Sequence, residues 1–139
     1  MTYPAVRCIM YVMERPATII LRERATDDPV LVTQGCVERM GNSWNVRYND
    51  GEAAYIVGIS DGMVTVTREG EEDYTVVLCE GKEYSFDVET PYGSLTMTVI
   101  PKIVKSRADE SGLSVRLAYE LAAGGASRKF RLLLDCKFI

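Results

Sequence analysis

The chain has 139 residues, which is enough for one domain with a substantial apolar core and no need of disulfides or metals. It carries 16 basic and 20 acidic side chains, a formal net charge of -4, so it has no overall positive field to attract nucleic acid or an anionic membrane. No apolar run approaches the roughly twenty residues that cross a bilayer, and the first residues lack the pattern of a secretory signal. We therefore expect a soluble cytoplasmic protein that binds neither nucleic acid nor membrane.

The first part of the chain is predicted to be extended. Residues 5–13 are rich in β-branched and sulfur-containing side chains, Pro16 interrupts this strand, and residues 18–23 form a second short extended run. After a polar turn, residues 30–38 form the next strand. Gly35 in the middle of that strand indicates a β-bulge, the device that bends a strand where a sheet curls.

The middle of the chain alternates between apolar and polar residues with the two-residue period of strands. Gly41, Gly51 and Gly62 each follow or precede asparagine or aspartate in short turns between these runs. The alternating runs cover residues 44–48, 53–59, 63–68 and 74–80. Successive hairpins are therefore expected.

The clearest hairpin lies between residues 82 and 100. Apolar side chains recur at every second residue on both sides of a Thr-Pro-Tyr-Gly turn. Pro91 fixes its own φ and Gly93 can adopt a positive φ, so the chain can reverse between them without strain.

The last part of the chain contains one ambiguity. Residues 101–105 extend or bend the preceding strand, and residues 106–112 are polar enough for an exposed loop. Residues 113–121 match a helix at three positions but alternate strictly at five, so we predict a strand. Residues 123–127 form a glycine-containing connection to the final strand, residues 130–138.

Together these patterns predict an all-β, antiparallel, mostly meandering fold of about eight to ten strands in a single domain spanning residues 1–139. Such strands either stack as a sandwich or close as a barrel. We favour a barrel, because closure removes the exposed edges that invite aggregation.

Several segments occur in the order found in a known family. They are residues 44–52, the V-T-V-T-R-E-G run of residues 64–70, Glu80-Gly81-Lys82, the Thr-Pro-Tyr-Gly turn leading into residues 95–99, and residues 113–121 with their A-Y-E-L ending. In these features the chain resembles the YwiB-like bacterial proteins, a family of unknown function, from about Val30 onward. Residues 18–23 depart from the family as extra material, and Asn49-Asp50 stands where the family tends to carry a glutamate. The resemblance implies a calycin-like, lipocalin-type barrel and no established activity.

The absence of histidine limits the chemistry available to this chain. It removes the usual general base near neutral pH, the common metal ligand, and nucleophile activation by a Ser-His or Cys-His pair. The acidic run in residues 69–73 lacks the spacing of a calcium loop and is typical of a solvated turn. We expect no cofactor.

The four cysteines are far apart in sequence, and none has C-x-x-C spacing. They are Cys8, Cys36, Cys79 and Cys136. We interpret them as small buried apolar thiols; four thiolates converging on one metal from separate strands, or disulfides, are the alternatives.

Five polar or aromatic side chains on predicted strands are our candidate ligand-binding residues: Arg68, Tyr119, Arg47, Tyr84 and Arg116. Facing into a barrel, they would orient a small polar or anionic ligand between apolar walls. The alternative is that the arginines point to solvent and the tyrosines complete the core at its rim. Arg68 ranks first, because it closes a strand otherwise made of valine and threonine.

Three functions are compatible with these observations. The first is a non-enzymatic barrel that binds a small molecule at its open end. The second is a protein-interaction or structural module that acts as a homodimer through exposed side chains and strand edges. The third is an enzyme that uses tyrosine, arginine and carboxylates, and it requires a cavity that holds a carboxylate of raised pKa.

Overall fold

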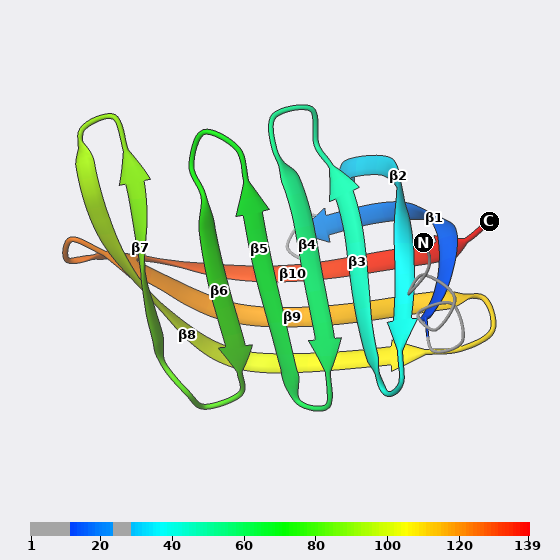
Figure 1. Ribbon diagram of the computed structural model, residues 1–139. Coiled ribbons are helices and arrows are strands. Elements are labelled where there is room, and N and C mark those ends of the chain that lie inside the picture. Colours follow the sequence, from blue (N-terminus) through cyan, green and yellow to red (C-terminus); the bar gives the residue numbers. More distant parts are fainter. Residues whose placement is uncertain (1–11, 24–28) are drawn as a thin grey trace.

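The computed structural model describes residues 12–23 and 29–139, and these residues form ten antiparallel strands and no helix (Figure 1). The strands are β1 (Val12–Glu23), β2 (Pro29–Met40), β3 (Ser43–Asn49), β4 (Ala54–Ser60), β5 (Met63–Glu69), β6 (Tyr74–Cys79), β7 (Tyr84–Thr90), β8 (Gly93–Ala108), β9 (Gly112–Ala123) and β10 (Ala126–Phe138). The described residues contain no helix long and apolar enough to span a membrane.

The strands form one sheet in the order β6-β5-β4-β3-β2-β1-β10-β9-β8-β7. Strands that follow one another in sequence therefore pair, except β6 and β7, which are the two ends of the sheet; the first and last strands, β1 and β10, pair with each other. The ladder between β1 and β10 places Ile19 opposite Cys136. The prediction of an all-β, meandering antiparallel barrel is confirmed.

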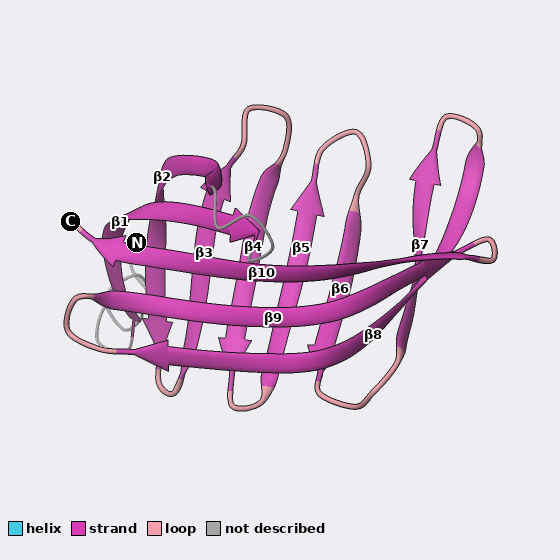
Figure 2. Ribbon diagram, turned by 180° about the vertical axis from the view of Figure 1, so that it is seen from behind, coloured by secondary structure: helices cyan, strands magenta, loops and turns pink. Residues whose placement is uncertain are grey.

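The sheet curls into two layers that cross steeply (Figure 1). Strands β2 to β6 stand in one layer, and β8 to β10 run across behind them; Figure 2 shows the same crossing from the other side. β1 joins the layers, because it pairs with β2 along one edge and with β10 along the other. The apolar faces of both layers point into the space between them.

The barrel closes incompletely between β6 and β7, the two ends of the sheet. These strands share no ladder, and their connection is fixed by an isolated bridge between Cys79 and Lys82. Gly81 N also donates a hydrogen bond to the carbonyl oxygen of Pro101 at 3.2 Å. From this point the two strands diverge (Figure 1).

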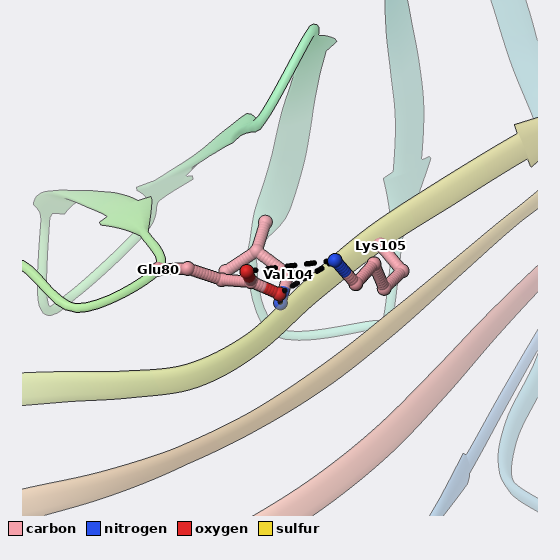
Figure 3. A network of polar contacts seen from close by, with 3 residues as sticks. All are labelled: Glu80, Val104 and Lys105. Carbon is pink, nitrogen blue, oxygen red and sulfur yellow. Dashed lines mark hydrogen bonds and ion pairs between the residues drawn. The ribbon is translucent and has the colours of Figure 1, made fainter.

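Glu80 strengthens the same end of the seam (Figure 3). Its Oε1 accepts a hydrogen bond from the backbone N–H of Val104 on β8 at 2.9 Å and lies 3.2 Å from Lys105 Nζ. The Glu80 side chain thus holds one end of the seam closed through its hydrogen bond to the backbone of β8.

One half of the barrel is filled. Its fully buried side chains include Ile19, Val37, Val46, Val64 and Cys136. Burial of each aliphatic side chain contributes about 1.5–3 kcal/mol to stability. At the end of this half, Trp44 stacks on Phe138 with ring centroids 6.3 Å apart. The two rings cover the core at this end and also line an open groove of about 510 Å³.

The segment at residues 113–121 is the strand β9, as alternation predicts. Its alternate residues Leu113, Val115 and Leu117 are buried, while Arg116 is exposed. The loop expected over residues 106–112 is shorter, because β8 continues to Ala108. The pairing of β8 with β9 shifts register between Pro101 and Ile103, which bends the strand without ending it.

Two expectations for the N-terminal strands are wrong. Pro16 does not interrupt a strand but lies within β1, where the ladder to β10 begins only at Ala17. A strand with a full ladder on one side tolerates proline. Residues 5–11 of the expected first strand lie outside the described residues.

Gly35 does not form a bulge. It pairs regularly with Ala17, and the register of β1 and β2 shifts instead between Leu21 and Arg22. Glycine is required for space, because a Cβ at this position would collide with the carbonyl oxygen of Arg47 and approach Ile19 Cγ1 to 2.9 Å.

Candidate functional site

The second half of the barrel contains a cavity of about 550 Å³, a volume within the range of small-molecule sites. Most of its wall is aliphatic: Leu21, Leu31, Val57, Val66, Val76, Leu78, Val99, Val115, Leu117, Leu121, Leu132 and Leu134. These side chains come from strands of both layers. The cavity is therefore enclosed by the barrel itself rather than by a surface loop.

Aromatic rings complete the wall. Tyr48, Tyr55, Tyr74, Phe86 and Tyr119 all line the cavity. Tyr48 stacks on Tyr55 with centroids 5.1 Å apart, and Tyr74 meets Phe86 at 5.7 Å across the seam between β6 and β7. This ring contact covers the seam from the inside of the barrel, where β6 and β7 share no ladder.

Burial changes the acidity of these phenols. It raises the pKa of Tyr119 to about 12 and raises the pKa values of Tyr48 and Tyr74 above their ordinary range. All three hydroxyls are therefore neutral hydrogen-bonding groups at physiological pH.

Strand register explains why a polar row crosses one end of the cavity. Tyr48, Tyr55, Arg68 and Tyr74 lie directly opposite one another on β3, β4, β5 and β6. Directly opposed residues on antiparallel strands share a face, and Arg68 alternates in phase with Val64 and Val66, which point inward. The row therefore forms a rim on the inner side of the barrel.

Arg68 is already engaged within this rim. Its Nε donates a hydrogen bond to Tyr55 Oη at 3.1 Å, and its Nη1 donates to the carbonyl oxygen of Glu72 at 2.6 Å. The bond to Tyr55 raises the pKa of the Arg68 guanidinium above its ordinary value. The guanidinium therefore holds the rim together and does not itself line the cavity.

Two carboxylates stand at the open end, in the turn between β3 and β4. Asp50 and Glu52 line the cavity and are exposed, so the cavity reaches solvent here. Asp50 Oδ1 accepts hydrogen bonds from Glu52 N at 2.8 Å and Ala53 N at 2.9 Å. These two bonds lower the pKa of the Asp50 carboxyl, with smaller contributions from Tyr55 and Arg68. Asp50 is thus ionised and fixed in place.

The five predicted binding residues have different locations. Tyr119 lines the cavity and Arg68 lies in its rim. Tyr84 points inward, but it packs against the core and stacks on Phe86 at 6.2 Å without lining the cavity. Arg47 and Arg116 are exposed on the outer face, because their strand neighbours point inward. The structure brings Arg68 and Tyr119 to this site and leaves Arg47 and Arg116 outside it.

The five candidates leave out five polar residues of the site: Tyr48, Asp50, Glu52, Tyr55 and Tyr74. A signal for the three tyrosines was present, because each alternates in phase with apolar residues on its strand. The carboxylates belong to a turn, and nothing in a turn sequence indicates which end of a barrel is hollow.

The described residues contain no group of three or more histidine, cysteine or acidic side chains placed to hold a metal. Cys36, Cys79 and Cys136 are free thiols, and Cys8 lies outside the described part of the chain. Of the three, only Cys136 is buried; burial raises its pKa to about 12. Partial burial and a hydrogen bond to Glu14 raise the pKa of Cys36 to about 11. Thiols that resist ionisation are poor metal ligands.

Ten antiparallel strands in a nearly closed barrel, filled at one end and hollow at the other, define an all-β barrel protein. Residues 17–132 match the family described as a Domain of unknown function (DUF1934), and the chain belongs to this family. Its structure is similar to the crystal structure of the ywiB protein from Bacillus subtilis, with a TM-score of 0.71 and 16% sequence identity over 93% of this chain and 92% of that chain. No curated protein matches the chain. The resemblance to the YwiB-like proteins is confirmed.

Proposed function

We propose that this protein is a non-enzymatic barrel that binds a small molecule in the cavity between its two layers. The observation that carries the proposal is the cavity itself, about 550 Å³ with an aliphatic and aromatic wall and polar groups at its open end. Apolar walls with a few polar groups that fix orientation are typical of ligand sites. The ligand would place an apolar body against the wall and a polar head at the mouth.

Chemical arguments favour binding over catalysis. A general base works best with a pKa near the operating pH. At the cavity the pKa of Asp50 is lowered and that of Tyr119 is raised, so both pKa values move away from physiological pH. We also propose a cytoplasmic location, which the free thiols of the described cysteines favour.

The proposal is tested by a neutral fluorescent probe, N-phenyl-1-naphthylamine, together with native mass spectrometry of the full chain as purified. Val66→Phe adds a ring to the cavity wall, and Thr67→Phe adds the same ring to the opposite face of β5 as a matched control. We expect probe binding by the unmodified protein and by Thr67→Phe, and at least about tenfold weaker binding by Val66→Phe. Absence of probe and copurified mass from the unmodified protein, or equal binding by both variants, would contradict the proposal.

A second candidate is a homodimer that pairs through a sheet edge. The observation that favours it is the outer edge of β7, which has no ladder partner among the described strands. In the hairpin that β7 forms with β8, Tyr92 is 99% exposed and Leu95 is 43% exposed. Unpaired edges are templates for strand addition. Light scattering of the full chain should then report twice the mass of one chain, and a strict monomer would sink this candidate.

A further inference from the structure

The charged side chains that line the cavity are all negative. Among the described residues that line the cavity, Asp50 and Glu52 carry charge, and no lysine or arginine is present. The backbone hydrogen bonds to Asp50 Oδ1 keep that carboxylate at the mouth. A ligand entering at this end therefore meets negative charge first.

Arg68 does not reverse this charge. Its guanidinium already donates to Tyr55 Oη and to the carbonyl oxygen of Glu72. That guanidinium does not line the cavity, whereas two carboxylates do, so an anionic ligand in the cavity would meet a net negative lining. The expectation of an anionic ligand depended on three inward arginines, and Arg47 and Arg116 lie on the outer face.

A second acidic turn lies at the same end of the barrel. The turns that join β3 to β4 and β5 to β6 stand side by side at the top of Figure 1, and Asp50 and Glu52 of the first turn line the cavity. The second turn contains Glu71, Glu72 and Asp73, all exposed. At physiological ionic strength such charges act over a screening length of about 8 Å, so they attract cations to the mouth.

The aromatic wall favours the same class of ligand. Tyr48, Tyr55, Tyr74, Phe86 and Tyr119 line the same cavity as the carboxylates. The face of an aromatic ring carries partial negative charge and attracts organic cations, above all when water is excluded. The rest of the wall is aliphatic and suits an uncharged body.

We infer that the ligand is an amphipathic organic cation, with an ammonium-type head between the carboxylates and tyrosines of the mouth and an apolar body in the barrel. This inference rests on the proposed binding function. The cavity supplies the site, and the sign of its lining charges supplies the ligand class.

The test compares three probes that share one decyl chain: decyltrimethylammonium, decanol and decanoate. Isothermal titration calorimetry with the full chain, below the aggregation threshold of each probe, should give the order cation, neutral, anion. We expect the cation to bind at least about tenfold more tightly than the anion. Decanol that binds as tightly as the cation, or decanoate that binds more tightly than decanol, would overturn the inference while leaving the binding function intact. Failure of all three probes would count against both.

Two variants separate charge from fold. Glu52→Gln and Asp50→Asn remove one carboxylate each, and the asparagine oxygen can still accept the two backbone bonds of the turn. Each should weaken cation binding about three- to tenfold and leave decanol binding unchanged. Asp61→Asn is the matched control, because it removes a carboxylate from an Asp-Gly turn at the opposite end of β4, where asparagine is equally favourable. An equal loss in Asp61→Asn and Glu52→Gln would overturn the inference.

Discussion

Glu80 accepts a hydrogen bond from the backbone N–H of Val104, 24 residues further along the chain, at 2.9 Å. This contact joins the link between β6 and β7 to the middle of β8. The ion pair with Lys105 adds little, because both side chains are substantially exposed at 39% and 62%. The bond from Val104 therefore closes the barrel at the seam together with the bond from Gly81 N to the carbonyl oxygen of Pro101.

Replacing Glu80 with glutamine should destabilise the protein at neutral pH but not in acid. The bonds to Val104 and Lys105 lower the pKa of Glu80 from its ordinary 4.5, so its contribution is present above pH 4.5. The contribution is lost as the pH falls through the lowered value. The unfolding free energies of the unmodified protein and of Glu80→Gln should converge in acid. A difference between them that persists or grows in acid would contradict this role of the Glu80 carboxylate.

The filled and hollow halves should respond differently to truncation. Ile19 is 0% exposed within the filled half, and Ile19→Ala should cost about 2–5 kcal/mol of unfolding free energy. Leu121 is half-buried and lines the cavity, so Leu121→Ala should cost less, on the order of 1–2 kcal/mol, because no close-packed neighbour is lost on the open side. Chemical denaturation measures both. Equal losses would mean that the cavity is closed in solution.

Most of the strand pattern could be predicted from the sequence, because alternation depends only on one face being buried. Residues 113–121 illustrate this, since their strict alternation excluded the helix that three leucines also allow. The same rule could have placed Arg47 outside, because it stands between Val46 and Tyr48, which point inward. The prediction went wrong there by treating a charged side chain on a strand as a candidate for the interior.

The site itself could be predicted only in part. Arg68 is a candidate because it closes a strand of valine and threonine, and Tyr119 because its large ring carries a hydroxyl; the structure places Arg68 in the rim and Tyr119 in the cavity wall. Asp50 and Glu52 were not, because a turn joins the site only when the nearby half of the barrel is hollow. Which half is filled depends on packing between strands distant in sequence, such as the stacking of Trp44 on Phe138.

Gly35 should resist replacement by any other residue. In Gly35→Ala, the new methyl group would meet the backbone carbonyl of Arg47, which cannot move without disturbing the pairing of β2 with β3. Overpacking of this kind costs about 1–3 kcal/mol or more. Gln34→Ala changes an exposed neighbour on the same strand and should have little effect. Thermal unfolding compares the two variants, and a Gly35→Ala protein as stable as Gln34→Ala would refute the proposed close approach.

Tyr119 should make the protein sensitive to alkali. Burial raises the pKa of Tyr119 from 10.0 to about 12, so the unfolded chain ionises first as the pH rises. The stabilisation from the neutral phenol is fully present below pH 10.0 and is lost between pH 10.0 and about 12. A rise of this size corresponds to about 3 kcal/mol. Tyr119→Phe has no phenol to ionise at this position, so its unfolding free energy should fall less over the same interval. Parallel curves for the variant and the unmodified protein would show that Tyr119 is solvated rather than part of a dry cavity wall.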